Sequence, residues 1–253
     1  MAGSRFVTGQ LVRGLRRRLT VAIGRARRGR RMPGDSLPPS RGLDDIPVAV
    51  LDTETTGLNP LRDRVVAVAG LRGDGGCLDT SLPLDLLVHP GIRIPPSSTK
   101  FHGIRDADVA TAPSFGLIWP SLRGFWRQRV LVGHNIGFDL ALLRQEAERA
   151  RIPFHPPGAA LDIGLLYAGL KPRLNTYTLE SMAEEYGVVI LHRHNALADA
   201  TAEGAIWCAL LRAMHGQGIG TLGQARALMG KRPDLLSNQH SAGWATDLLV
   251  PHG

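Results

Sequence analysis

The chain has 253 residues, of which 43% are hydrophobic, and it carries a formal net charge of +8. This length and composition suffice for one sizeable core, and no apolar run approaches the roughly 20 residues that a membrane-spanning helix needs. The two cysteines, Cys77 and Cys208, lie far apart and outside any C-x-x-C pair. A disulfide framework, a thiolate zinc site and stable membrane insertion are therefore not expected, and a cytoplasmic location fits.

The positive charge is concentrated at the N-terminus. Residues 1–45 contain 11 Arg and 3 Asp, whereas residues 46–253 contain 19 basic and 19 acidic side chains. The first segment therefore holds the whole excess charge, and we expect it to be a basic, solvated arm and linker. Phosphate contact, an anionic membrane surface and an organelle transit peptide are the alternative roles for such an Arg-rich segment.

The body of the chain is predicted to begin with three strands joined by hairpins. Residues 48–51 form an apolar run that suits a buried strand. Residues 64–71 and 77–82 have the composition of two further strands, and the glycine-rich sequence at 73–76 is typical of a hairpin turn.

Helices and strands then alternate. A Pro-rich loop at 90–98 precedes a helix expected over 113–126, which Pro120 should kink or split. The other expected elements are strands at 130–133 and 160–163 and helices at 137–150, 179–186 and 198–214. Together the elements predict an α/β fold with a mixed sheet. We divide the chain into the arm (1–45), a domain (46–215) and a C-terminal extension (216–253).

Two acids, Asp52 and Glu54, stand where the first strand ends. Residues i and i+2 of a strand point to the same face, so the two carboxylates project side by side. Like charges about 4 Å apart repel by roughly 4 kcal/mol at an effective dielectric of 20. A divalent cation, which prefers oxygen ligands, removes that cost. An isolated pair of this kind more often marks a solvated strand end. The choice between that interpretation and a cation site therefore depends on the rest of the sequence.

The pair opens the sequence D-T-E-T-T-G-L, in which Gly57 allows close backbone approach and the Thr hydroxyls can bind a phosphate or a sugar. A second segment, H-N-I-G-F-D, places Asp139 in the first turn of a helix, where an acid also suits the helix dipole. A third, H-N-A-L-A-D, separates His194 from Asp199 by five residues, which would turn the side chains about 140° apart on one helix. His194 is therefore expected on the preceding loop, and a surface histidine is its alternative interpretation. His192 is a nearby decoy.

Together the three motifs resemble the proofreading exonucleases with the acid set Asp-Glu-Asp-Asp and a histidine (the DEDDh type), and in particular the epsilon subunits of bacterial DNA polymerase III. The motifs have the family's order and internal spacing, and the resemblance runs from about Pro47 to Met214. It implies a ribonuclease H-like α/β fold, with a five-stranded mixed sheet of three antiparallel and two parallel strands flanked by helices. It implies a metal-dependent 3′→5′ exonuclease that releases nucleoside 5′-monophosphates from the 3′ end of DNA, in proofreading, repair or DNA turnover.

The resemblance also implies roles for individual residues. Four acids would hold two divalent cations, Mg²⁺ or Mn²⁺, and His194 would be the general base that takes a proton from the attacking water. The metal ligands expected are Asp52, Glu54, Asp139 and Asp199. Contacts to the substrate are expected from Thr55, Thr56, Gly57, Leu58, His102, Asn135 and Phe138. Asp162 is expected to be structural.

Several alternatives stay open. A single-stranded or frayed 3′ end of DNA is the expected partner, and a DNA polymerase is a second one, although the tail contains no recognisable polymerase-binding motif. Because DNA and RNA enzymes share these motifs, an exoribonuclease or oligonucleotide-degrading enzyme is the first alternative. A non-catalytic nucleic-acid-binding module is another, against which the five filled catalytic positions argue. A membrane-surface protein led by the basic arm is a third.

Overall fold

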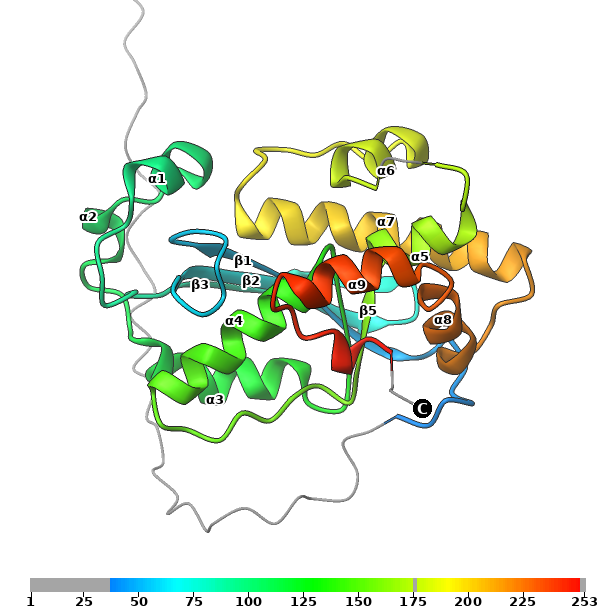
Figure 1. Cartoon of the computed structure of the whole chain (residues 1–253), viewed down its shortest axis with the longest axis horizontal. Helices are drawn as coiled ribbons and strands as arrows, with labels where there is room; N and C mark the ends of the chain where they lie inside the picture. The colour runs from blue at the N-terminus through cyan, green and yellow to red at the C-terminus, as the bar shows by residue number, and fades with distance from the viewer. Residues whose placement is uncertain (1–36, 175–176, 251–253) are drawn as a thin grey trace, which may run out of the picture. The chain divides into compact units, whose positions relative to one another are not determined.

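A mixed sheet with the strand order β3-β2-β1-β4-β5 lies at the centre of the computed structural model, which describes residues 37–174 and 177–250 (Figure 1). The strands are β1 (Pro47–Thr55), β2 (Val65–Asp74), β3 (Cys77–Leu87), β4 (Val130–Gly133) and β5 (Ala159–Asp162). β1, β2 and β3 pair antiparallel, and β4 pairs parallel with both β1 and β5. The predicted fold class is confirmed. The expectations for the basic arm at 1–34 lie outside the described residues.

The predicted hairpin joins β2 to β3. Asp74 pairs with Cys77, so Gly75 and Gly76 form a two-residue loop. Gly75 has a φ of 56°, and a Cβ there would lie 1.9 Å from the Asp44 carbonyl oxygen, so this turn requires glycine. β3 continues to Leu87 instead of ending at residue 82. It is the exposed edge strand, and Pro83 inside it interrupts the strand pattern at the point where the prediction ended.

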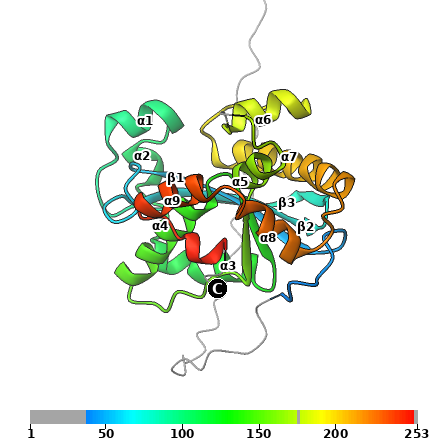
Figure 2. The ribbon, with the colours of Figure 1, turned by 45° about the vertical axis from the view of Figure 1, so that its right-hand side comes forward.

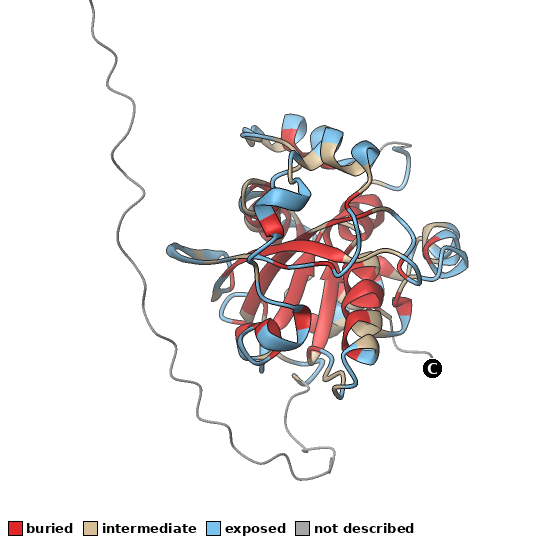
Figure 3. Cartoon of the chain, turned by 90° about the vertical axis from the view of Figure 1, so that its left-hand side faces the viewer, coloured by how far each residue is buried: buried red, intermediate tan, exposed pale blue. Residues whose placement is uncertain are grey.

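Helices cover both faces of the sheet. They are α1 (Pro96–His102), α2 (Asp106–Val109), α3 (Phe115–Trp126), α4 (Ile136–Arg149), α5 (Ile163–Leu170), α6 (Leu179–Tyr186), α7 (Ala196–Gly216), α8 (Leu222–Met229) and α9 (Pro233–Ser241), with a 3₁₀ turn η1 (Thr246–Leu248). α7 packs across β1 and β2, with α3 and α4 on the opposite face (Figure 1). Figure 3 shows the buried residues gathered in the sheet and in the helix faces against it.

The helices differ from the expectation at two points. α1 begins inside the predicted Pro-rich loop, after Pro95 at its N-cap. α3 runs without interruption through Pro120, so the predicted split does not occur. Pro120 itself is exposed, whereas buried aromatic residues on both sides of it, Trp119 and Trp126, hold the helix against the core. That packing stabilises the helix enough to offset the backbone hydrogen bond that proline removes.

The described part of the C-terminal extension packs against the domain. α8 contacts α5 and β5, and its buried residues Leu222, Leu228 and Met229 belong to the main core. α9 lies beside α4 in both views (Figures 1 and 2). Across residues 37–174 and 177–250, none of the helices has the length and apolar character needed to cross a membrane.

Candidate active site

Three of the predicted metal ligands meet at one point. β1 presents Asp52 and Glu54 on one face, and the first turn of α7 brings Asp199 opposite them. One carboxylate oxygen from each of the three residues lies within 4.8 Å of the other two. The strand geometry expected for Asp52 and Glu54 therefore produces an oxygen-rich site at the end of a buried strand.

Asp139, the fourth predicted ligand, approaches from the α4 side and does not belong to this set of three. It is buried, and its Oδ1 accepts a hydrogen bond of 2.5 Å from Thr53 Oγ1. Thr53 lies between Asp52 and Glu54 on β1 and so points to the opposite face of the strand. Asp139 is close enough to raise the pKa of Asp52. The structure therefore places Asp139 beside the cluster, with one oxygen held by Thr53.

Glu203 is a further acid that the sequence interpretation left without a role. It stands one helical turn after Asp199 on α7, so the two side chains share a face. Glu203 is buried, and burial first, then the charge of Asp139, raises its pKa well above the ordinary value. Glu203 is also the strongest electrostatic influence on Asp52, whose pKa is raised well above its usual range by burial and by neighbouring carboxylates. The i+4 spacing from a predicted ligand is the signal that could have identified it.

Burial and mutual repulsion act on the other acids too. Burial, then Asp199 and Asp139, raise the pKa of Glu54 to about 7, with Arg193 opposing them. Burial raises the pKa of Asp139 to about 7, although the hydrogen bond from Thr53 favours its ionised form. Without a cation, the protein thus holds these carboxylates partly protonated at neutral pH.

The chemistry of the donor set fits a divalent cation. Asp52 Oδ2, Asp199 Oδ1 and Glu203 Oε2 are buried without a hydrogen-bond partner. A buried polar atom left without a partner destabilises a protein by about 1–3 kcal/mol, and more when it is charged. Oxygen-only ligands with excess negative charge are the environment that Mg²⁺ and Mn²⁺ prefer. A bound cation would therefore satisfy these atoms and relieve the repulsion.

Arg193 supplies positive charge at the edge of the cluster, and sequence reasoning missed it. Its Nη1 lies 2.5 Å from Asp199 Oδ2, and its Nε lies 2.6 Å from Glu180 Oε1 on α6. The guanidinium thereby connects the loop before α7 to α6 through an ion pair, and it partly neutralises the charge of Asp199. The contact with Glu180 spans 13 residues, so spacing alone does not reveal it.

His194 lies on the loop before α7 and Asp199 lies inside the helix, as predicted. The backbone of His194 has a φ of 62°, and its N–H donates to Asp199 Oδ2 at 3.0 Å. Its ring stands edge-on to Phe101, with the ring centroids 5.5 Å apart. His192, the decoy, is exposed. The backbone of the candidate base His194 therefore contacts the predicted metal ligand Asp199.

The predicted substrate contacts border the cluster. Thr55 Oγ1 donates to the Gly57 carbonyl at 2.6 Å, and His102 Nε2 lies 3.2 Å from the Thr55 carbonyl oxygen. Burial lowers the pKa of His102, and His194 adds to that effect. Thr56 Oγ1 donates to Asp63 at 3.0 Å. This turn therefore has little freedom, because its side chains are engaged with its own backbone and neighbours.

Gly57 packs closely against Asp63 within that turn, and an exposed side chain follows it. A Cβ at Gly57 would lie 2.6 Å from an Asp63 carboxylate oxygen. Leu58 is 86% exposed, so its side chain is free to meet a ligand. On α4, Asn135 adopts the left-handed conformation at the N-cap, and Phe138 stands half-buried. Asp162 accepts hydrogen bonds from the backbone of Gly164 and Leu165 at the start of α5, in line with the expected structural role.

Comparison with known proteins identifies the family of this chain. The exonuclease family of the RNase T type matches residues 49–206, which include every acid of the cluster. The chain belongs to this family. The DNA polymerase III subunit epsilon-like protein of Rhodobacter capsulatus is 34% identical over 211 residues, 82% of this chain and 30% of the relative. The DNA polymerase III subunit epsilon of Aquifex aeolicus is 29% identical over 177 residues, 70% of this chain and 86% of the relative. The expected resemblance is therefore confirmed.

Solved exonuclease structures share the fold. Exonuclease X in complex with 5′ overhanging duplex DNA is 25% identical, with a TM-score of 0.56 over 72% of this chain and 99% of its own. Exonuclease I of E. coli with a dT13 oligonucleotide is 17% identical, with a TM-score of 0.60 over 68% of this chain and 42% of its own. The chain spans 30% of the length of the Rhodobacter relative and 13% of the DNA polymerase III PolC-type of Caldanaerobacter subterraneus.

Proposed function

We propose that this chain is a metal-dependent 3′→5′ exonuclease that hydrolyses the terminal phosphodiester bond of DNA and releases nucleoside 5′-monophosphates. The observation that carries the proposal is the convergence of Asp52, Glu54 and Asp199 on one point, with His194 bonded through its backbone to Asp199. Membership of the exonuclease family supports the reaction class. A non-catalytic binding module would have no need for buried carboxylates that repel one another.

Two divalent cations, Mg²⁺ or Mn²⁺, are the cofactors that this site would hold. Asp52, Glu54 and Asp199 would be ligands, and Asp139, which lies beside them with one oxygen bonded to Thr53, would be the fourth. When bound, such a cation pair stabilises the negative charge on the attacking and leaving oxygens of the phosphoryl group. The unpartnered buried oxygens of Asp52 and Asp199 support this assignment.

The residues around the cluster would then position a water molecule and the strand. An imidazole nitrogen of His194 takes a proton from the water whose oxygen attacks the terminal phosphorus. The bond between phosphorus and the 3′ oxygen of the preceding sugar breaks, and that oxygen acquires a proton. Packing against Phe101 and the backbone bond to Asp199 fix the orientation of His194. The segment Thr55–Leu58, with His102 beside it, would hold the terminal nucleotide.

DNA with a single-stranded or frayed 3′ end is the proposed substrate, and a DNA polymerase is the proposed protein partner. The structures of exonuclease X and exonuclease I hold DNA, which supports the first choice. Relatives named as DNA polymerase III subunits support the second. A cytoplasmic location is consistent with a DNA substrate and with Cys77 and Cys208, which form no disulfide.

The proposal is tested with strands labelled at the 5′ end. The protein is incubated in Mg²⁺ with single-stranded DNA, duplex DNA and RNA of one sequence, and the products are separated by size. We expect a ladder that shortens one nucleotide at a time on DNA and no reaction in excess EDTA. A ladder on RNA alone would instead establish the exoribonuclease, and full activity in EDTA would exclude the metal-dependent mechanism.

A further inference from the structure

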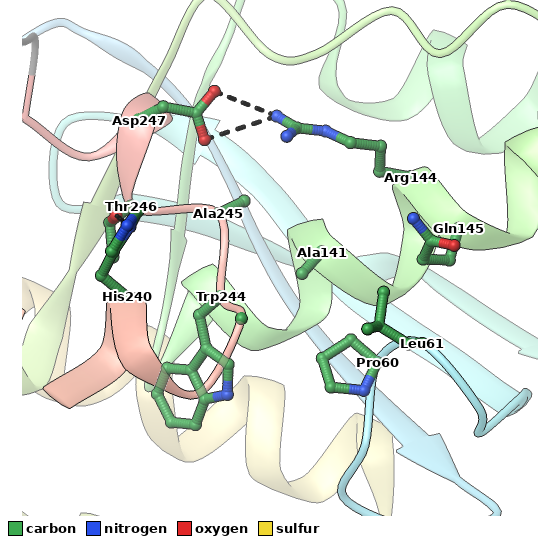
Figure 4. A pocket seen from close by; sticks show the side chains of 11 residues that line it. Pro60, Leu61, Ala141, Arg144, Gln145, His240, Trp244, Ala245, Thr246 and Asp247 are labelled. Atoms are coloured by element: carbon green, nitrogen blue, oxygen red, sulfur yellow. Dashed lines mark hydrogen bonds and ion pairs between the residues drawn. The ribbon is translucent and has the colours of Figure 1, made fainter.

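A cavity of about 310 Å³ opens beside α4, between the turn that follows β1 and the C-terminal segment (Figure 4). Pro60 and Leu61 form one wall, Ala141 and Gln145 of α4 lie between the walls, and Trp244 stands on the far side. Small-ligand sites occupy about 300–1,000 Å³, so this cavity suits a single nucleoside better than several. Trp244 lies outside residues 49–206, the part of the chain that the family matches.

Trp244 packs directly against α4, the helix that contains Asp139. Its indole packs edge-on against the ring of Phe138, with centroids 5.9 Å apart, and Phe138 immediately precedes Asp139. The backbone N–H of Ala245 donates to the Gly137 carbonyl at 2.9 Å. The indole is therefore held against the first turn of α4, and the cavity continues from that turn along the same helix.

The segment that carries Trp244 is firmly placed. Arg144 Nη2 on α4 lies 3.1 Å from Asp247 Oδ2, and Leu249 is buried in the main core. The indole itself is half-buried and borders two cavities, because it also lines a second space of about 230 Å³ next to Asn135 and Leu235. Trp244 thus presents aromatic surface to open space while its backbone is fixed on both sides.

We propose that Trp244 is a stacking platform for a nucleobase of the substrate strand upstream of the scissile phosphate, in the cavity that Pro60 and Leu61 close. This inference rests on the proposed exonuclease function. The indole shares this cavity with the apolar side chains of Pro60 and Leu61, which suits the flat, apolar face of a base, and the amide of Gln145 can donate to a sugar or phosphate oxygen. Because stacking is available to every base, Trp244 would hold the strand without selecting its sequence.

The test compares two substrates, and it removes either the side chain of Trp244 or one base of the substrate. The first substrate is the p-nitrophenyl ester of thymidine 5′-monophosphate, which occupies the terminal-nucleotide site alone. The second is a five-nucleotide single strand, used intact and with one abasic site placed in turn at each upstream position. kcat/KM is measured in Mg²⁺ for wild type and Trp244→Ala. We expect the loss on the intact strand to exceed the loss on the ester by roughly 5- to 150-fold, the range of base–aromatic stacking.

The abasic strands identify the stacked base. At one upstream position, removing the base should lower kcat/KM of the wild type by a similar factor and should have little further effect on Trp244→Ala. Trp244→Leu, which keeps apolar volume without an aromatic face, should behave like Trp244→Ala, and Trp244→Phe should retain most of the effect. If the alanine variant does not fold, as judged by circular dichroism, the leucine and phenylalanine variants decide the question.

Leu61→Ala and Leu235→Ala form a matched pair that locates the base. Leu61 lines the proposed cavity and Leu235 lines the other one. The proposal expects coupling between the abasic site and Leu61→Ala and none with Leu235→Ala. The reverse pattern, or equal losses on ester and strand for Trp244→Ala, would overturn it. A wild type that cleaves neither substrate would instead refute the exonuclease function on which the inference rests.

Discussion

Replacing Glu54 with Gln should stabilise the protein at alkaline pH when no metal is present. The pKa of Glu54 rises from 4.5 in its ordinary state to about 7 in the fold, because the side chain is buried beside Asp199 and Asp139. At about 1.4 kcal/mol per pKa unit, holding this carboxylate ionised in the folded protein costs up to roughly 3 kcal/mol. Gln removes the charge and keeps the shape, so Glu54→Gln should gain up to that amount at pH 8.

The sign of the pH dependence follows from proton binding. Between pH 4.5 and about 7, the folded protein keeps a proton on Glu54 that the unfolded chain has released. The free energy of unfolding of the wild type should therefore fall as pH rises through this window. Below it, both states are protonated, so Glu54→Gln and wild type should have nearly equal stability.

Urea unfolding in EDTA, followed by tryptophan fluorescence at pH 4 to 8.5, measures this difference. Glu184→Gln on α6 is the matched control because Glu184 is exposed, and its effect should be small at every pH. Mg²⁺ at pH 8 should stabilise the wild type more than Glu54→Gln, since the variant lacks a ligand. A difference between Glu54→Gln and wild type that is flat with pH, or a variant less stable at pH 8, would refute this reasoning.

Further predictions concern turnover and the basic arm. Asp52→Ala and Asp199→Ala should nearly abolish cleavage in Mg²⁺ while circular dichroism shows an intact fold; an active variant would remove that residue from the metal site. His194→Ala should lower kcat by roughly 10²–10⁴-fold, the usual contribution of a general base, with little change in strand binding. If His192→Ala is damaging and His194→Ala is silent, the assignment of His194 as the general base is wrong. Deleting residues 1–34, which lie outside the described part of the chain, should leave single-turnover cleavage of saturating DNA unchanged. It should also reduce the log–log salt slope of strand binding by about 2–3 units, as expected for three or four lost phosphate contacts; an unchanged slope would exclude this role.

The sequence predicted the elements whose pattern is strong. β4 and α6 begin and end where expected, because a short apolar run and a cap followed by an amphipathic turn mark their limits. α5 was missed because every residue in it is buried, so no polar face reveals helical periodicity. α2 has only four residues, too few for a periodic signal. The sequence did contain a signal for the start of α1, because proline is favoured at the first position of a helix.

The site was predictable where motif spacing fixes geometry. The strand alternation of Asp52 and Glu54 and the loop position of His194 followed from the sequence and are present in the structure. Arg193 could not be assigned, because its role depends on Glu180 from another helix. The contact between Trp244 and Phe138 is likewise a product of tertiary packing, since 106 residues separate the two rings.

The central claim is that these carboxylates direct hydrolysis of the 3′-terminal phosphodiester bond. A single strand of DNA labelled in its 3′-terminal nucleotide tests it most directly, in one turnover with excess protein and Mg²⁺. The proposed mechanism predicts that the label leaves first, as a nucleoside 5′-monophosphate, and that neither EDTA-treated protein nor Asp52→Ala releases it. Label that remains in an oligonucleotide, or that appears as a nucleoside 3′-monophosphate, would contradict the claim.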